Sequence, residues 1–132
     1  MKILVSGLCG FMGKEVAALA KEGYRGAKLA AGVDMAATGQ EEVPCAKGFA
    51  DAATDVDCII DFSHHACTKD LLSFAVKNRL PLVLATTGQT EQEKAAIMQA
   101  AKEIPLFFAA NYSLGVALLI ELAVQTAKAM PE

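Results

Sequence analysis

Three glycines near the amino terminus are the residues of this chain best suited to binding an anion. Gly7, Gly10 and Gly13 directly follow an apolar run over residues 2–6. Glycines at such a place let the chain turn sharply, bring backbone N–H groups close to a pyrophosphate, and pack a new helix closely. Asp34 ends a second apolar run, where a carboxylate can accept hydrogen bonds from ribose hydroxyls. The pattern predicts a dinucleotide-binding turn, with an ordinary glycine-rich turn as the alternative.

A strand and a helix must flank such a turn, and the chain supplies both in regular alternation. Apolar runs predict strands, and segments with helical periodicity predict helices. We expect strands at residues 2–6, 28–33, 56–62, 82–86 and 106–109. We expect helices from the glycine turn to Gly23, from about 67 to 78, from a capping box at Thr90 and Glu93 to residue 103, and from about 114 to 130.

Continuous apolar strands separated by helices predict a parallel sheet covered on both faces. Right-handed crossovers make such a sheet doubly wound. The expected fold class is therefore α/β, a Rossmann-type doubly wound parallel sheet that forms a single domain over residues 1–132. Residues 35–50 have no clear period, and we expect a surface excursion there with a short strand near residues 47–50.

Two of the helices carry specific expectations about burial. The first is expected to place Met12, Val16, Leu19 and Ala20 on one face. The last is apolar almost all the way round, which predicts burial on more than one side.

Polar or glycine-containing segments follow each of the main strands. They are residues 7–13, Asp34, 62–65, 85–88 and 109–113. Because ligands of doubly wound sheets bind at the carboxyl ends of the strands, we expect these segments to converge on one crevice. Each segment taken singly is also compatible with an ordinary turn.

Composition excludes several other classes of function. A net charge of −3 offers no basic stripe for nucleic acid. The four cysteines match no zinc-binding spacing, so we expect no metal site and reduced thiols in a cytoplasmic protein. The first residues do not form a signal peptide, and no stretch is long and apolar enough for a membrane span.

Four motifs together resemble a known family. They are Gly7-x-x-Gly10-x-Met12-Gly13, Asp61-Phe62-Ser63, Thr86-Thr87-Gly88 and Ala110-Asn111-Tyr112-Ser113-x-Gly115-Val116. In this order they resemble the nucleotide-binding domain of the 4-hydroxy-tetrahydrodipicolinate reductases (dihydrodipicolinate reductases) of bacterial lysine and diaminopimelate biosynthesis. The resemblance covers essentially the whole chain. It implies an oxidoreductase that reduces a cyclic imine-type substrate by hydride transfer from NADH or NADPH.

The resemblance also assigns the cofactor-binding residues. It implies that residues 7–12 hold the pyrophosphate, Asp34 the adenosine ribose, residues 85–87 the nicotinamide ribose region, and residues 109–112 the nicotinamide end and the hinge. The candidates are Gly7, Leu8, Cys9, Gly10, Phe11, Met12, Asp34, Ala85, Thr86, Thr87, Ala109, Ala110, Asn111 and Tyr112.

No catalytic residue is expected within these 132 residues. Members of the family continue into a second domain with a His-His pair, a lysine and a Ser-Gly-Thr segment, and the sequence contains none of these as a matching motif. We therefore expect the substrate domain to be absent, the chain alone to bind dinucleotide without turnover, and the full-length protein to be a homo-oligomer.

Four positions bear on which cofactor is bound and how closely it approaches. Asp34 faces the place of a 2′-phosphate, and neither Met35 nor Phe11 supplies a cation there, so we expect NADH to be preferred and NADPH to remain possible. Ala85 stands where the family usually has a glycine. A methyl group there is expected to be tolerated but to tighten the approach of the cofactor.

His64 and His65 resemble a catalytic pair, but they follow the third main strand rather than the family's catalytic motif. We expect a loop or helix-capping role, with lining of the nicotinamide pocket as the alternative, and little role in proton transfer or metal binding. Two other functions remain open: another NAD-dependent dehydrogenase, and a non-enzymatic NAD(H) sensor.

Overall fold

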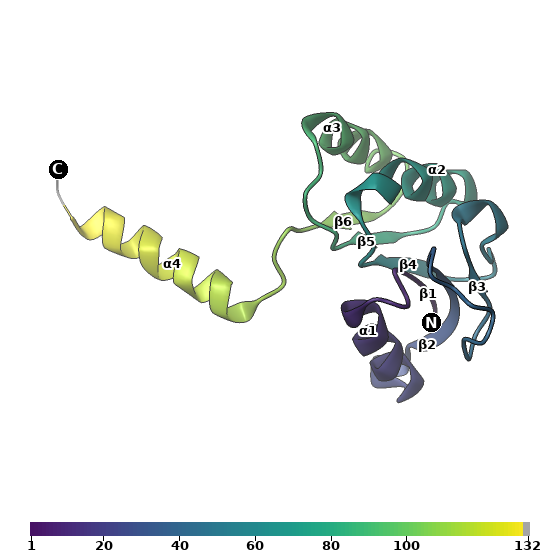
Figure 1. Cartoon of the computed structure of the whole chain (residues 1–132). Helices are drawn as coiled ribbons and strands as arrows, with labels where there is room; N and C mark the ends of the chain where they lie inside the picture. Colours follow the sequence, from purple (N-terminus) through teal and green to yellow (C-terminus); the bar gives the residue numbers. More distant parts are fainter. Residues whose placement is uncertain (131–132) are drawn as a thin grey trace.

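Six parallel strands form the centre of the computed structural model, which describes residues 1–130 (Figure 1). The strands are β1 (Lys2–Ser6), β2 (Lys28–Val33), β3 (Cys45–Ala46), β4 (Cys58–Asp61), β5 (Leu82–Leu84) and β6 (Leu106–Phe108). Their order in the sheet is β3-β2-β1-β4-β5-β6, which is the order typical of dinucleotide-binding folds. The expected α/β doubly wound fold is confirmed. Pro131 and Glu132, which end the expected domain, lie outside the described residues.

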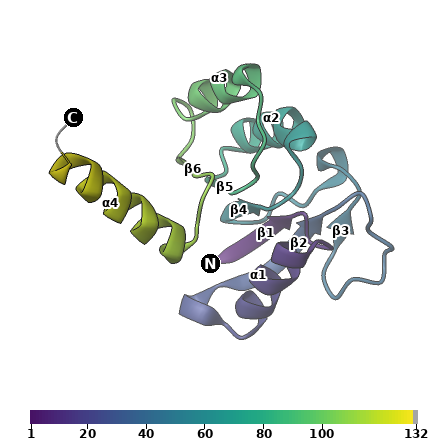
Figure 2. The same cartoon turned by 60° about the vertical axis from the view of Figure 1, so that its left-hand side comes forward.

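Helices cover both faces of this sheet. They are α1 (Phe11–Lys21), α2 (Thr68–Asn78) and α3 (Glu91–Ala100), whereas the fourth helix, α4 (Leu114–Ala129), does not lie on the sheet. In both views α2 and α3 lie side by side on one face, and α1 lies on the other (Figures 1 and 2). Leu71 and Ile97 join the larger core with β4 and β5, whereas Ala17 and Ala20 join a smaller core with β1.

The buried face of α1 agrees only in part with the expected one. Gly13, Ala17 and Ala20 are buried, whereas Met12 and Leu19 are 45% and 48% exposed. Small residues at this face allow the helix to lie close to the turn that precedes it, because a Cβ at Gly13 would collide with the carbonyl oxygen of Gly7. Of the four expected residues, Ala20 is buried and Val16 packs against the smaller core, so the prediction is wrong for Met12 and Leu19.

Several element boundaries also move. The short strand in the excursion is β3, two residues before the expected segment, because Gly32 and Asp34 of the β2 edge donate to the carbonyls of Pro44 and Ala46. Residues 49–51 form a 3-10 turn instead of a strand. Both β4 and β5 are shorter than expected, and α3 ends at Ala100 rather than at residue 103.

Helix α4 projects away from the sheet in both views (Figures 1 and 2). Every residue from 110 to 130 is exposed, including Leu118, Leu119 and Ile120. The expected burial of this helix on more than one side is therefore not observed within residues 1–130. Among residues 1–130, none of the helices has the length and apolar character needed to cross a bilayer.

Candidate functional site

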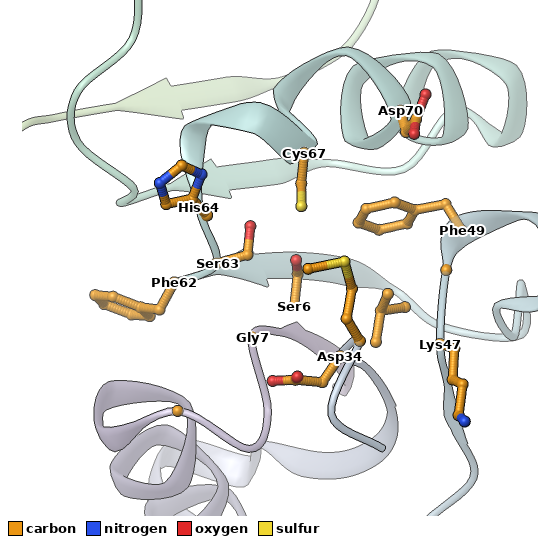
Figure 3. A pocket seen from close by; sticks show the side chains of 14 residues that line it. Ser6, Gly7, Asp34, Lys47, Phe49, Phe62, Ser63, His64, Cys67 and Asp70 are labelled. Carbon is orange, nitrogen blue, oxygen red and sulfur yellow. The ribbon is translucent and has the colours of Figure 1, made fainter. Parts of the chain in front are cut away.

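A cleft of about 340 Å³ lies at the carboxyl edge of the sheet, between the turn after β1 and the loop after β4 (Figure 3). Its lining residues are Ser6, Gly7, Gly10, Val33, Asp34, Met35, Lys47, Gly48, Phe49, Phe62, Ser63, His64, Cys67 and Asp70. Three of the expected segments meet in this cleft: the glycine turn, Asp34 and the start of the loop after β4. The segments at residues 85–88 and 109–113 follow β5 and β6 at the same edge, but they do not line this cleft.

Each glycine of the turn has a separate structural reason. Gly7 adopts a φ of +79°, which side chains rarely tolerate, and a Cβ there would collide with the carbonyl of Phe62. Gly13 allows the close approach of α1 described above. At Gly10 the nearest atom to an added Cβ is the Gly7 carbonyl oxygen at 3.2 Å, so Gly10 is restricted on one side only. Its other side faces the cleft, which leaves room for a ligand at the backbone.

The turn delivers the chain into the amino-terminal end of α1. Gly10 is the N-cap residue, and it offers no side-chain cap to the first turn. That turn also contains no acidic residue, so its N–H groups and the positive end of the helix dipole remain available. An uncapped helix start beside a glycine turn is an established way to bind phosphate.

Within residues 7–12 the backbone donors are unequal. The Gly7 N–H donates to Val33 O at 2.8 Å, and the Gly10 N–H donates to Gly7 O at 3.1 Å. The Cys9 N–H donates to Oδ2 of Asp34 at 2.9 Å. The donors of this segment left for a ligand are therefore the N–H of Leu8 in the turn and those of Phe11 and Met12 at the start of α1.

The side chains of this segment also differ in exposure. Leu8 is buried in the core beside α1, whereas Phe11 is 79% exposed. Any contact of Leu8 with a ligand would therefore come from its backbone alone.

Asp34 is half-buried, and its carboxylate points toward the glycine turn (Figure 3). Oδ1 accepts a hydrogen bond from the Ala36 N–H at 2.8 Å, and Oδ2 accepts the bond from Cys9. Each carboxylate oxygen can accept more than one hydrogen bond, so both retain capacity for ribose hydroxyls. Asp34 thus braces the turn and presents acceptors to the cleft at the same time.

Burial raises the pKa of the Cys45 thiol to about 11, with the neighbouring Cys9 thiol as the second cause. The pKa of Cys9 is also raised, first by burial and then by the Asp34 carboxylate. Both thiols therefore stay protonated near neutral pH. This supports the interpretation that they act as small apolar side chains.

A buried hydrogen-bond network joins the loops after β4 and β5. Asp61 ends β4 and is 1% exposed, and its carboxylate accepts bonds from the hydroxyls of Ser63 and Thr86 at 2.6 and 2.5 Å. Ala85 is also buried, and its N–H donates to Asp61 O at 3.0 Å. The methyl group of Ala85 therefore faces the protein rather than the open edge.

The segment after β6 is anchored through its aromatic residue. The Tyr112 hydroxyl donates to Leu84 O at 3.3 Å, and its ring packs against Phe62 and Phe107. Burial raises the pKa of Tyr112, which keeps the hydroxyl a donor. Asn111 turns inward on its own segment, because its Oδ1 accepts from the Ser113 N–H at 2.8 Å. Ala109 is half-buried and Ala110 is exposed.

The two histidines have different local partners. The Nδ1 of His64 accepts from the Ala66 N–H at 3.2 Å and caps a 3-10 turn, so the expected capping role is observed. His64 also lines the cleft. The Nδ1 of His65 lies 3.4 Å from Oε1 of Glu93, which links this loop to the start of α3. Within residues 1–130, no three His, Cys, Asp or Glu side chains are grouped as metal ligands would be.

Several residues of the cleft escaped the sequence-based reasoning, and four of them add side chains from two further segments. Lys47 and Phe49 come from the irregular excursion, and Cys67 and Asp70 come from the start of α2 (Figure 3). The lysine adds a positive charge to the same cleft as Asp34. No local pattern identifies it, because the excursion has no periodicity and β3 alone places it at this edge.

Three comparisons with known proteins agree with this geometry. The model of the family described as "Dihydrodipicolinate reductase, N-terminus" matches residues 1–112. Among curated proteins named 4-hydroxy-tetrahydrodipicolinate reductase, the one from Caldanaerobacter subterraneus subsp. tengcongensis is 38% identical over 130 residues, which are 98% of this chain and 51% of that protein. The one from Clostridium perfringens strain SM101 is 33% identical over 100% of this chain and 52% of its own length. The chain thus spans about half the length of these relatives.

The fold also has a counterpart among solved structures. The apo scyllo-inositol dehydrogenase from Lactobacillus casei superposes with a TM-score of 0.65 at 20% identity. The match covers 95% of this chain and 41% of that structure. At this level of identity the likeness supports the fold alone.

Proposed function

The chain belongs to the dihydrodipicolinate reductase family, and from that premise we propose that it binds the nicotinamide dinucleotide for a longer oxidoreductase. The whole protein would reduce 4-hydroxy-tetrahydrodipicolinate to tetrahydrodipicolinate in lysine and diaminopimelate biosynthesis. The observation that carries the proposal is the glycine turn, which opens an uncapped helix directly beside Asp34 in the cleft at the carboxyl edge of the sheet.

The two halves of the dinucleotide fit the two halves of the sheet. In folds of this strand order each half binds one mononucleotide. We assign the adenosine ribose to Asp34, the pyrophosphate to the start of α1, the nicotinamide ribose to residues 85–87 and the nicotinamide end to residues 109–112. A bound NADH would supply the hydride, and the residues of this chain would bind and orient it.

NADH is the proposed preferred cofactor, with NADPH as a weaker alternative. The Asp34 carboxylate would repel a 2′-phosphate, and Met35, which is 78% exposed, offers no charge to offset it. Lys47 opposes this preference, because it brings to the same cleft a cation that would attract a 2′-phosphate. Its exposed ammonium is screened by solvent and should moderate the preference rather than reverse it.

We place catalysis outside this chain. Positioning of a substrate beside a cofactor accounts for roughly 7–11 kcal/mol of a reaction barrier, so groups that hold the substrate are indispensable. The basic side chains of α2, Lys69 and Lys77, are exposed to solvent. The substrate-holding groups and the contacts of a homo-oligomer would therefore come from residues beyond these 132. The four free thiols support a reducing, cytoplasmic location.

Two measurements test the proposal. Calorimetric titration of the 132-residue chain with NADH should show saturable binding, while NADH oxidation with freshly generated substrate should be undetectable. The same assay on a protein in which this chain is fused to the second domain of a relative should show turnover. Absence of NADH binding would refute the proposal. Turnover by the chain alone at the rate of the complete enzyme would show that the catalytic groups lie within it.

A further inference from the structure

Asp61 is a buried carboxylate whose charge is stabilised by hydroxyl groups. It is 1% exposed, and within residues 1–130 no Lys, Arg or His forms an ion pair with it. Its Oδ2 accepts the Thr86 hydroxyl at 2.5 Å, and its Oδ1 accepts both the hydroxyl and the N–H of Ser63, at 2.6 and 3.3 Å. Hydroxyl bonds of this length to a carboxylate are charge-assisted and strong.

The donors come from two different loops of the same sheet edge. Ser63 follows β4, and Thr86 follows β5, 25 residues away from Asp61 along the chain. The loop after β5 is fixed at two further points, because the Ala85 N–H donates to Asp61 O and the Gln89 amide donates to Thr86 O at 2.8 Å. Asp61 therefore sets the position of one loop relative to the other.

The network leaves the two neighbouring threonines with different tasks. Thr86 is 6% exposed, and its hydroxyl is committed to Asp61. Thr87 is exposed, and its hydroxyl has no hydrogen-bond partner in the part of the chain that the structure describes. Of this pair, only the Thr87 side chain is free to meet a ligand at the edge.

We propose that Asp61 is a positioning residue for the nicotinamide half of the cofactor, acting through Thr86 to hold the loop that presents Thr87. The proposal rests on the proposed function and deepens it by dividing the roles within one loop. A buried carboxylate is costly unless its hydrogen bonds are satisfied, and here all of the side-chain bonds go to loops at the ligand edge rather than to the core. The carboxylate thus orders the edge that a nicotinamide ribose would contact.

The test compares two ligands that share the adenosine and pyrophosphate groups. NADH engages both halves of the edge, whereas ADP engages only the half built by β1, β2 and the glycine turn. We expect Asp61→Asn and Thr86→Val each to weaken NADH binding by about tenfold and to change ADP binding by less than about twofold. Thr86→Ser retains the hydroxyl and should restore NADH affinity to within about twofold of the wild type.

A matched control removes a similar hydrogen bond elsewhere. Thr38→Val deletes the exposed hydroxyl bond to Glu41, 3.0 Å long, and should leave the ratio of NADH to ADP affinity unchanged. Circular dichroism monitors folding, and Thr86→Val, which keeps the carboxylate, serves if Asp61→Asn does not fold.

The outcomes separate the two levels of the proposal. Equal losses of NADH and ADP affinity, or unchanged NADH affinity in Thr86→Val, would overturn the role of Asp61 alone. A wild-type chain that binds neither ligand would overturn the proposed function and this role with it.

Discussion

The half of the sheet formed by β1, β2 and β3 presents backbone groups at its carboxyl edge, whereas the half formed by β4, β5 and β6 has an edge held by side chains. In the first half, Gly7 and Gly13 shape a turn whose conformation and packing depend on the absence of side chains. In the second half, Asp61, Thr86 and Tyr112 tie three loops together by side-chain hydrogen bonds. We therefore expect ligand binding at the first half to be weakened by substitutions that add side-chain atoms. At the second half, we expect it to be weakened by substitutions that remove hydrogen-bonding groups.

Adding atoms to the glycine turn should produce the largest effect. We expect Gly10→Val to weaken both NADH and ADP binding by about 100-fold or more, because the branched side chain would occupy the open side of Gly10 where the pyrophosphate must approach. Calorimetry with both ligands measures the loss, and circular dichroism should show a folded chain.

Gly115→Val is the matched control, since an added Cβ there meets nothing closer than Ser113 Oγ at 3.7 Å. It should leave both affinities unchanged. Retained NADH affinity in folded Gly10→Val would show that the turn is not the phosphate site.

The charge of Asp34, in the first half, should have the next largest effect, which is on the preference between NADH and NADPH. The wild-type chain is expected to bind NADH at least roughly tenfold more tightly than NADPH, because a charge-assisted bond to ribose hydroxyls is worth about 1.5–3 kcal/mol. Asp34→Ala combined with Met35→Arg should shift the preference toward NADPH. Titration of both proteins with both cofactors measures this, and equal or tighter NADPH binding by the wild type would contradict the assignment of Asp34.

Substitution of Lys47 should change the difference between NADH and NADPH affinity by a smaller amount. Lys47→Ala should weaken NADPH binding by about threefold and leave NADH binding unchanged, since exposed ion pairs contribute about 0.2–1 kcal/mol. Raising the salt concentration should shrink the difference between wild type and variant. An equal loss for NADH and NADPH would contradict this assignment and indicate that Lys47 contacts a group common to both cofactors.

A change at the start of α3, away from the ligand edge of β4, β5 and β6, should lower the stability of the fold without altering NADH affinity. Helix α3 begins with a complete capping box, in which Thr90 Oγ1 accepts from the Glu93 N–H and Glu93 Oε2 accepts from the Thr90 N–H at 2.7 Å. Thr90→Ala should lower the free energy of unfolding by about 1 kcal/mol. Denaturant melts measure this loss, and NADH titration should show none. A change in NADH affinity would connect α3 to the ligand edge.

The pH dependence of this cap has a definite sign. The hydrogen bond from the Thr90 N–H, ahead of smaller contributions from the Thr90 and His65 side chains, lowers the pKa of Glu93. The contribution of Glu93 is therefore present above the ordinary glutamate pKa and is lost as the pH falls through its lowered value. The stability difference between wild type and Glu93→Gln should shrink over that acidic range.

The sequence predicted the backbone half of the site better than the side-chain half. Gly7 and Asp34 belong to a local pattern whose spacing follows from the geometry of one strand, one turn and one helix. The bond between Asp61 and Thr86 depends instead on β4 pairing with β5, which a local pattern does not encode. Lys47 escaped for a similar reason, because its place in the cleft depends on the two-residue strand β3.

The sequence also did not predict correctly which helix residues are buried. Periodicity identified α1 but selected Met12 and Leu19 as buried, because it weighs hydrophobicity and takes no account of how closely a glycine lets two segments approach. Helix α4 shows the converse. Its sequence is apolar almost all the way round, yet every residue of the helix is exposed.

The open start of α1 has a consequence for folding as well as for binding. Helix α3 completes its own first turn with Thr90 and Glu93, whereas α1 leaves that task to whatever occupies the cleft. A bound pyrophosphate would therefore act as the missing cap, and part of its binding energy would appear as order in the first turn of α1. Amide hydrogen exchange at Phe11 and Met12 should be fast in the free chain and slow in the bound one. The ligand would then be a structural component of the helix that receives it.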